Sequence, residues 1–206
     1  MAGGLFVTLE GPEGAGKTTA AAALTARLRA EGQEVLLTRE PGGTQGAEAV
    51  RALLLNQAVP LDPLAQTLLH FAARADHVAR LIRPALARGA LVICDRFHDS
   101  TMAYQAYGQG VDQEAVRALI SLIGLSPDLT FLLDLPEAER RRRLALRGGA
   151  EDRYEAMGEA FFQRVAAGFE AIAAAEPARF ARVAASAAPE ALAAEMRRIL
   201  KQRTGR

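Results

Sequence analysis

The sequence predicts an α/β fold with a five-stranded, all-parallel sheet and helices on both of its faces. Two observations lead to this prediction. Short runs of β-branched or large apolar residues alternate with longer amphipathic stretches along the 206 residues. A glycine-rich loop follows the first apolar run and opens a helical pattern. No internal repeat, low-complexity linker or domain boundary interrupts the alternation, so we expect a single domain over residues 1–206.

The expected strands are too short for helices and are bounded by longer helical patterns. They span residues 5–9, 34–38, 90–94, 129–133 and, more weakly, 179–185. Helices are expected over 17–31, 62–88, 99–108, 112–124 and 136–149, and over 156–175 and 189–202 in the alanine-rich C-terminal third. Pro84 predicts a kink in the long second helix, because proline removes a backbone donor and collides with the preceding turn.

Composition excludes several classes of protein. Lys plus Arg number 25 and Asp plus Glu 24, and this near balance argues against a general nucleic-acid coat. The single cysteine, Cys94, allows no internal disulfide and is expected to be a small buried hydrophobe. No run approaches the roughly 20 apolar residues of a membrane span, and the N-terminus lacks the pattern of a secretory signal. We expect a cytoplasmic protein without nucleic-acid or membrane partners.

The loop after the first strand reads GPEGAGKT over residues 11–18 and fits G-x-x-x-x-G-K-[ST] at every fixed position. Glycines let backbone amides turn inward, and those amides with the helix N-terminus form an anion site. Lys17 can reach the terminal phosphates of a nucleoside triphosphate, and Thr18 can offer its hydroxyl to Mg²⁺. The residues expected to bind this nucleotide are Gly11, Pro12, Glu13, Gly14, Ala15, Gly16, Lys17, Thr18 and Thr19.

The apolar run 90–94 leads directly into Asp95. A parallel strand delivers such a side chain to the carboxyl edge of the sheet, beside the phosphate loop. We therefore expect Asp95 to join Thr18 in the shell of Mg²⁺, acting through water. The alternative is a helix N-cap or a partner of Arg96, and these roles can coexist with the first.

Four further segments resemble the thymidylate kinases, which convert dTMP to dTDP. They read TREPGGTQ (38–45), HFAARADH (70–77), DRFHDSTMAYQ (95–105) and PDLTFLLDLP (127–136), and the similarity runs from about residue 5 to residue 155. The first and third segments together are specific to that family. The resemblance implies a P-loop NTPase-type fold with a small lid over about 143–155, Mg-ATP as phosphoryl donor and dTMP as acceptor. It also implies direct in-line transfer and a homodimer packed near the 62–88 helix.

Phe71 and Arg74 are three residues apart on a predicted helix, so they share a face. A flat ring and a planar guanidinium can stack on a pyrimidine and hydrogen-bond to it. The resemblance assigns them this role, with the matching Phe on thymine and the matching Arg on its O4. The alternative is a core Phe beside an exposed Arg.

A second helical face carries Ser100, Thr101, Tyr104 and Gln105. The resemblance implies that Thr101 and Gln105 lie near the base, with Ser100 beside them, and that Tyr104 crowds the 2′ position of the sugar. The alternative is a helix N-terminus capped by Ser100, with Tyr104 in a packing role.

The acceptor phosphate needs fixed cations, and guanidinium groups bind phosphate oxygens in pairs. At the positions that match the family stand Arg39, Arg51 and Arg96, each of which could instead be a solvated surface group. Glu13 is an unusual negative charge inside a phosphate loop. The resemblance gives it the 3′-hydroxyl of the acceptor sugar, and the alternative is a pair with a nearby arginine.

The arginine-rich segment ERRRRLALRGGAEDRYE (139–155) includes the expected lid, about 143–155, with Gly148 and Gly149 as a hinge. None of the variable loop residues 12–15 is basic, so the chain resembles the thymidylate kinases whose catalytic arginines lie in the lid. A lid that delivers arginine to the transferred group also excludes water. The predicted catalytic residues are Lys17, Arg96, Arg147 and Arg153, and Arg143 is placed near ATP. The run 140–142 is expected to be a solvated face.

Two alternatives remain open. The first is a kinase for another pyrimidine monophosphate, and the second is a P-loop nucleotide switch, for which the chain lacks an N-K-x-D stretch. The family's usual acid near adenine is replaced by Ala184, so adenine contacts there would come from the backbone. His70, His77 and His98 lack metal-like spacing and are expected to be core or surface residues.

Overall fold

The computed structural model describes residues 3–147, 153–154 and 157–205. Its sheet has the strand order β2-β3-β1-β4-β5, and every pairing is parallel. The strands are β1 (Leu5–Glu10), β2 (Val35–Arg39), β3 (Leu91–Asp95), β4 (Leu129–Asp134) and β5 (Phe180–Ala184). All five predicted strands are thus confirmed, with each end shifted by at most one residue.

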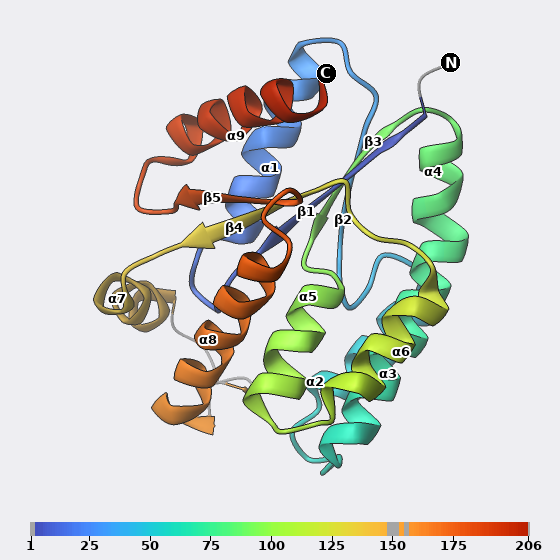
Figure 1. Ribbon diagram of the computed structural model, residues 1–206, viewed down its shortest axis with the longest axis vertical. Helices are drawn as coiled ribbons and strands as arrows, with labels where there is room; N and C mark the ends of the chain where they lie inside the picture. Colours follow the sequence, from blue (N-terminus) through green and yellow to red (C-terminus); the bar gives the residue numbers. More distant parts are fainter. Residues whose placement is uncertain (1–2, 148–152, 155–156, 206) are drawn as a thin grey trace.

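Helices cover both faces of the sheet (Figure 1). They are α1 (Lys17–Ala30), α2 (Gln45–Leu55), α3 (Pro63–His77), α4 (Arg83–Ala87), α5 (His98–Thr101), α6 (Gln113–Ile123), α7 (Glu137–Arg147), α8 (Glu159–Ala175) and α9 (Pro189–Thr204). Helix α2 was not predicted. Its N-terminal signal is present, because Thr44 accepts a hydrogen bond from the Ala47 amide at 3.2 Å and caps the helix.

The predicted long helix over 62–88 is divided by a π-helical segment, η1 (Val78–Ile82). Pro84 then stands in the first turn of α4. The predicted single helix is thus interrupted by the π segment just before Pro84. A second π segment, η2 (Met102–Gly108), continues α5 in the same way.

The core lies on both faces because neighbouring strand residues point to opposite sides. Val7 packs in the cluster with α1 and α9, which includes Leu24 and Met196. Phe6 packs on the other face, in the cluster that holds Val78 and Cys94. Cys94 is a buried free thiol, as predicted.

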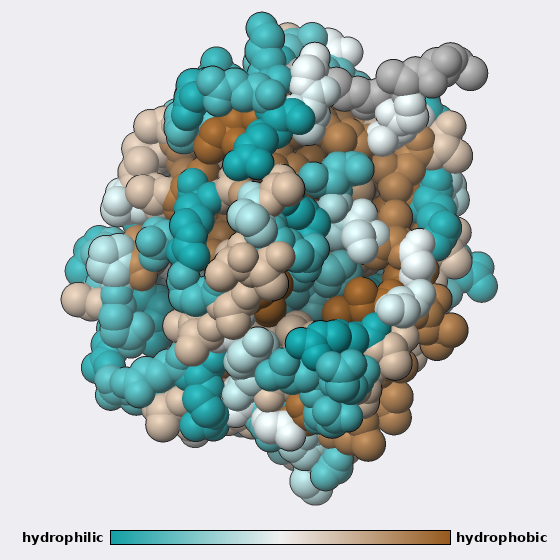
Figure 2. All heavy atoms as spheres, viewed as in Figure 1, coloured by the Kyte–Doolittle hydropathy of each residue, from teal (hydrophilic) through white to brown (hydrophobic). Residues whose placement is uncertain are grey.

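The carboxyl ends of β1, β2 and β3 meet at one edge, because Asp95 pairs with both Leu9 and Arg39 in register. The loops after these strands therefore converge there, which is where parallel sheets bind ligands. Figure 2 shows hydrophilic residues over most of one face of the molecule, with hydrophobic ones between them. No helix in the described ranges is long and apolar enough to cross a bilayer.

Candidate active site

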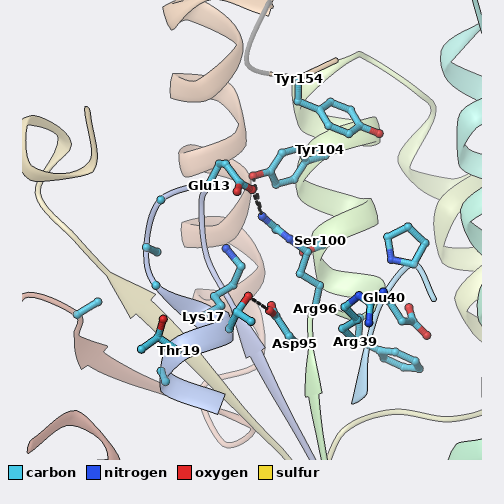
Figure 3. Close-up of a pocket in the computed structure, with 18 of the residues that line it drawn as sticks. Glu13, Lys17, Thr19, Arg39, Glu40, Asp95, Arg96, Ser100, Tyr104 and Tyr154 are labelled. Carbon is cyan, nitrogen blue, oxygen red and sulfur yellow. Dashed lines mark hydrogen bonds and ion pairs between the residues drawn. The ribbon is translucent and has the colours of Figure 1, made fainter. Parts of the chain in front are cut away.

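A pocket of about 750 Å³ opens at this edge of the sheet (Figure 3). Two groups of residues line it, and we name them separately. The loop end consists of residues 13–20 of the phosphate loop and α1, with Arg143 and Leu192. The opposite end is lined by Arg39, Glu40, Arg51, His70, Arg74, Ser100, Thr101, Tyr104 and Gln105. Asp95 and Arg96 lie between the two groups.

The phosphate loop has the backbone that its glycines predict. Gly11, Gly14 and Gly16 all have positive φ, and a Cβ on Gly11 would lie 2.8 Å from the Leu133 carbonyl oxygen. The Lys17 ammonium lies over the loop and donates to the carbonyls of Gly11 at 3.0 Å and Pro12 at 2.8 Å. Burial, reinforced by the charge of Arg96, lowers the pKa of Lys17 to about 8. A bound anion would favour the charged ammonium again.

Thr18 and Asp95 meet beside the loop, although 77 residues separate them. The Thr18 hydroxyl donates to Asp95 Oδ2 at 2.5 Å, and the buried Oδ1 has no hydrogen-bond partner within the described residues. A hydroxyl and a carboxylate with a free oxygen fit Mg²⁺, which takes one or two carboxylates plus phosphate and water. The described ranges contain no cluster of three or more His, Cys, Asp or Glu side chains able to hold a metal. The remaining ligands would come from the nucleotide and water.

Arg96 connects the two ends of the pocket. Its φ of 69° lies in the left-handed region, a strained conformation that clusters at functional sites. Nη2 lies 2.7 Å from Glu13 Oε2, and Nη1 lies 3.0 Å from Ser100 Oγ. Glu13 thus forms an ion pair with an arginine, which was the alternative to its expected sugar contact. Figure 3 shows this pair close to the Lys17 ammonium.

Glu10, which was not predicted from the sequence, holds the Ser100 hydroxyl to which Arg96 donates. Its carboxylate accepts from the Phe97 amide at 2.7 Å and from Ser100 Oγ at 2.5 Å. Burial, together with the charge of Asp99, raises the pKa of Glu10 well above its ordinary value. The sequence feature that could have indicated a functional role for Glu10 is its position, since it ends a buried strand directly before the glycine loop.

At the opposite end, the predicted helical face lines the pocket with all four of its residues: Ser100, Thr101, Tyr104 and Gln105. Arg39 and Arg51 also line it. Arg39 is half-exposed and pairs with Glu48 at 2.9 Å, whereas Arg51 Nη1 donates to the Pro41 carbonyl at 2.8 Å. Both guanidinium groups therefore keep donors near the cavity.

Phe71 and His70 occupy different places from those the sequence suggested. Phe71 does not line the pocket and is buried with Met102, Ala103 and Phe161 in the core. His70 does line it, with Nε2 3.2 Å from the Tyr154 hydroxyl. Residues three and four positions from Arg74 share its helical face, so the spacing could not choose between them. Phe71 is thus a core residue, as in the alternative, and the place of His70 in the pocket lining was not predicted.

The environment of His70 keeps its imidazole neutral. Burial and the nearby charges of Arg74, Arg96 and Arg51 lower the pKa of His70 to about 3. The uncharged ring is therefore the favoured form of His70 in the cavity at neutral pH.

Arg74 is 2% exposed, which contradicts the alternative of a surface arginine. Its Nε donates to Glu40 Oε2 at 2.7 Å and its Nη2 to Thr101 Oγ1 at 3.1 Å. Nη1 is buried and has no partner within the described residues. This nitrogen is available to a ligand in the pocket.

The predicted lid arginines are distributed unequally. Arg143 lines the loop end and donates to the Ala185 carbonyl at 2.9 Å. Arg147 ends α7, but its side chain and residues 148–152 lie outside the described residues. Arg153 does not line the pocket, because its guanidinium donates to the carbonyls of Asn56 at 2.6 Å and Val59 at 2.7 Å.

The prediction of a solvated face over 140–142 is wrong for Arg140. That side chain is buried, pairs with Glu137 at 2.7 Å and packs on the Phe162 ring at 4.8 Å. Arg141 and Arg142 are exposed, as expected. The helix face alone did not reveal that Arg140 lies against α8.

Phosphoryl transfer between two nucleotides needs two anion-binding surfaces that face one another, since donor and acceptor must meet in line. Lys17 and Arg74 line one cavity and belong to two such surfaces. The fold and the pocket therefore define a P-loop nucleotide kinase.

The comparisons with known proteins identify the family. A family model described as Thymidylate kinase matches residues 9–196. The chain is 56% identical to a thymidylate kinase of Gluconobacter oxydans over 95% of this chain and 94% of that one. It is 50% identical to a thymidylate kinase of Chromohalobacter salexigens over 98% of each chain. The crystal structure of a thymidylate kinase from Ehrlichia chaffeensis superposes with a TM-score of 0.79 at 36% identity, covering 97% and 100% of the two chains. The chain belongs to the thymidylate kinase family.

Proposed function

We propose that this pocket is the active site at which the chain transfers the γ-phosphoryl group of ATP to dTMP, giving ADP and dTDP. Family membership gives the two substrates and the reaction. The observation that carries the assignment of the site is the one cavity that Lys17 and Arg74 both line. A nucleotide switch needs no second anion surface, so this alternative is not supported.

The loop end holds ATP in this proposal. The amides of residues 11–19 surround the phosphates, and Lys17 moves from its loop carbonyls to the β and γ oxygens. Arg143 lies at the adenine side with Ala185 and Leu192. Adenine is then held by a guanidinium plane, apolar atoms and backbone.

Thr18 and Asp95 would hold Mg²⁺, since they meet beside the loop and Asp95 Oδ1 is without a partner in the described part of the chain. Bound Mg²⁺ neutralises charge on the β and γ phosphates. The hydrogen bond between Thr18 and Asp95 would hold the two side chains in place for the ion. Their placement at the end of β3 and the start of α1 ties this site to the phosphate loop.

The opposite end holds dTMP. Arg39, Arg51 and Arg96 offer donors to its phosphate, and the attacking phosphate oxygen thereby faces the loop end. The neutral ring of His70, in place of Phe71, offers a flat surface to thymine. Arg74 Nη1 and Gln105 offer donors to the base edge, with Thr101 and Ser100 beside them. Tyr104 and Glu13 stay assigned to the sugar.

Arg153 completes the site in this proposal only after a movement. Arg153 would have to leave Asn56 and Val59 to reach a phosphoryl group. We expect Arg153→Ala to lower kcat far more than it raises either KM. A wild-type kcat in that variant would exclude the lid role of Arg153, and Arg147 would remain the candidate.

A homodimer is the proposed assembly. Support comes from apolar side chains that remain exposed on the neighbouring helices α2 and α3: Leu53 at 38%, Leu64 at 47% and Leu68 at 50%. Sedimentation equilibrium should give twice the chain mass, and Leu68→Asp should shift it towards the monomer. A cytoplasmic location stays a prediction.

The reaction itself is tested by mixing protein, ATP and Mg²⁺ with and without dTMP while ADP and dTDP are measured. ADP should appear in equal amount with dTDP and only when dTMP is present. Nucleotide turnover that ignores dTMP would contradict the proposal. Replacing dTMP by dUMP should lower kcat/KM about 5- to 150-fold, because one methyl group is worth about 1–3 kcal/mol.

A further inference from the structure

A buried carboxylate, Glu40, lines the opposite end of the pocket and accepts hydrogen bonds from two side chains of α3. Its Oε2 accepts from Arg74 Nε at 2.7 Å, and its Oε1 accepts from His77 Nδ1 at 2.9 Å. On the far side of the ring, His77 Nε2 lies 2.8 Å from Thr38 Oγ1. All four residues are at most 9% exposed, so water does not compete for these contacts.

These contacts fix the Arg74 guanidinium in one orientation. Nε is held by Glu40 and Nη2 by Thr101. The faces of the group are covered by the rings of Phe71 and Phe97, with centroids 4.7 Å and 5.1 Å from Cζ. Only Nη1 has no partner among the described residues. A guanidinium group held in this way presents a single nitrogen, Nη1, to the cavity that Arg74 lines.

His77 is one step further from the pocket and does not line it. It is fully buried, and its proton position follows from its neighbours. A carboxylate only accepts hydrogen bonds, so Nδ1 must carry a proton. The Thr38 hydroxyl pairs with Nε2 and thereby keeps the ring in that orientation. The sequence of contacts is therefore Thr38, His77, Glu40, Arg74.

We propose that Glu40 and His77 are positioning residues for the acceptor base: His77 orients Glu40, and Glu40 orients Arg74 so that Nη1 meets the pyrimidine edge. This inference rests on the proposed function, because it takes the opposite end as the dTMP site. An arginine fixed before binding loses less side-chain entropy when the ligand arrives. The contacts run on the acceptor side only, so they should act on the KM for dTMP and not on the KM for ATP.

Two amide variants of His77 distinguish a role in positioning Arg74 from a role in packing alone. Asparagine places its amide nitrogen where Nδ1 stands and can still donate to Glu40, whereas glutamine places it near Nε2 and cannot. We expect His77→Gln to raise the KM for dTMP about three- to tenfold, the value of one hydrogen bond. The rise in His77→Asn should be clearly smaller. The KM for ATP should stay within about twofold in both variants.

Two controls accompany this pair. Thr8→Val removes a buried hydroxyl contact with Thr130 elsewhere in the sheet, which is 2.8 Å long, and should lower stability without moving the KM for dTMP. In an Arg74→Ala background, His77→Gln should change the KM for dTMP less than twofold, because Arg74 is no longer present to be oriented. If His77→Gln does not fold, Thr38→Val tests the same contacts with one altered atom and should raise the KM for dTMP about twofold.

The outcomes are distinct. A higher KM for dTMP in the Gln variant than in the Asn variant, lost in the Arg74→Ala background, supports the inference. Equal effects of Asn and Gln, a parallel rise in the KM for ATP, or a full effect without Arg74 would overturn it. So would an unchanged KM for dTMP in Thr38→Val if that variant has to be used. A wild-type protein that fails to phosphorylate dTMP would instead overturn the proposed function.

Discussion

The two ends of the pocket are built in different ways. The loop end is built around one continuous segment, residues 13–20, with Arg143 and Leu192 beside it. Its lysine contacts backbone groups, since Lys17 donates to the carbonyls of Gly11 and Pro12. The opposite end is assembled by side chains from β2, α2, α3, α5 and η2. Contacts there join distant positions, such as Arg74 with Glu40, 34 residues apart.

This difference predicts different sensitivities. The phosphate loop depends on a few glycines and one lysine. Substitutions there should change the KM for ATP and kcat. The opposite end depends on how each ring and guanidinium is packed. Substitutions there should change the KM for dTMP and leave the KM for ATP unchanged. Variants that affect only one substrate would strengthen this distinction, and variants that affect both equally would remove it.

The largest effect is expected at the loop end. Lys17→Met should lower kcat about 10²- to 10³-fold, because it removes a fixed cation from the transferred phosphoryl group. Steady-state kinetics with dTMP and ATP provide the measurement, and binding of dTMP alone should be nearly unchanged. Lys201→Met, an exposed position on α9, is the matched control. A kcat within tenfold of wild type would contradict the role of Lys17.

The next effect is expected at the opposite end. Arg74→Ala should raise the KM for dTMP about 30- to 150-fold, since a hydrogen bond to a charged group contributes about 2–3 kcal/mol. The KM for ATP should stay within about twofold. Equal loss of both affinities would show that the two ends do not act separately.

A smaller effect distinguishes the two aromatic neighbours on α3. His70→Ala should raise the KM for dTMP about tenfold, because a stacked base gains about 1–3 kcal/mol from a ring. Phe71→Ala should instead lower the free energy of unfolding by about 3–5 kcal/mol, as expected for a buried Phe. Kinetics and urea unfolding on both variants provide the comparison. The reverse pattern would restore Phe71 as the stacking ring.

The smallest effect concerns pH. The folded-state pKa of His70, about 3, lies below its ordinary value of 6.5. The unfolded chain therefore binds the proton more readily, and His70 stabilises the fold above about pH 6.5 and loses that contribution as pH falls towards 3. Because the ring is partly exposed in the pocket, we expect wild type to lose about 1 kcal/mol more than His70→Gln between pH 7 and pH 5. Urea unfolding at both pH values measures this, and identical losses would mean that His70 titrates normally.

Much of the fold could be predicted from the sequence, because the patterns that indicate strands and helices are local. The apolar runs predicted all five strands, and the order of strand, glycine loop and helix predicted that α1 begins at the loop lysine. Asp95 was found because a parallel strand must deliver its last residue to the carboxyl edge. Helix α2 was not predicted, although the local sequence contains its start signal, since Thr44 caps it.

The chain alone determined the phosphate loop, the strand order along the sequence and the family, since each of these depends on residues close together or on a continuous pattern. Tertiary packing decided the rest. It turned His70 rather than Phe71 to the cavity and placed Glu10 against the Phe97 amide and the Ser100 hydroxyl. It also placed Glu40 between Arg74 and His77 and held Arg153 on the carbonyls of Asn56 and Val59. Helical spacing specifies a face only to within one residue, and a buried ion pair depends on which distant segment supplies the opposite charge.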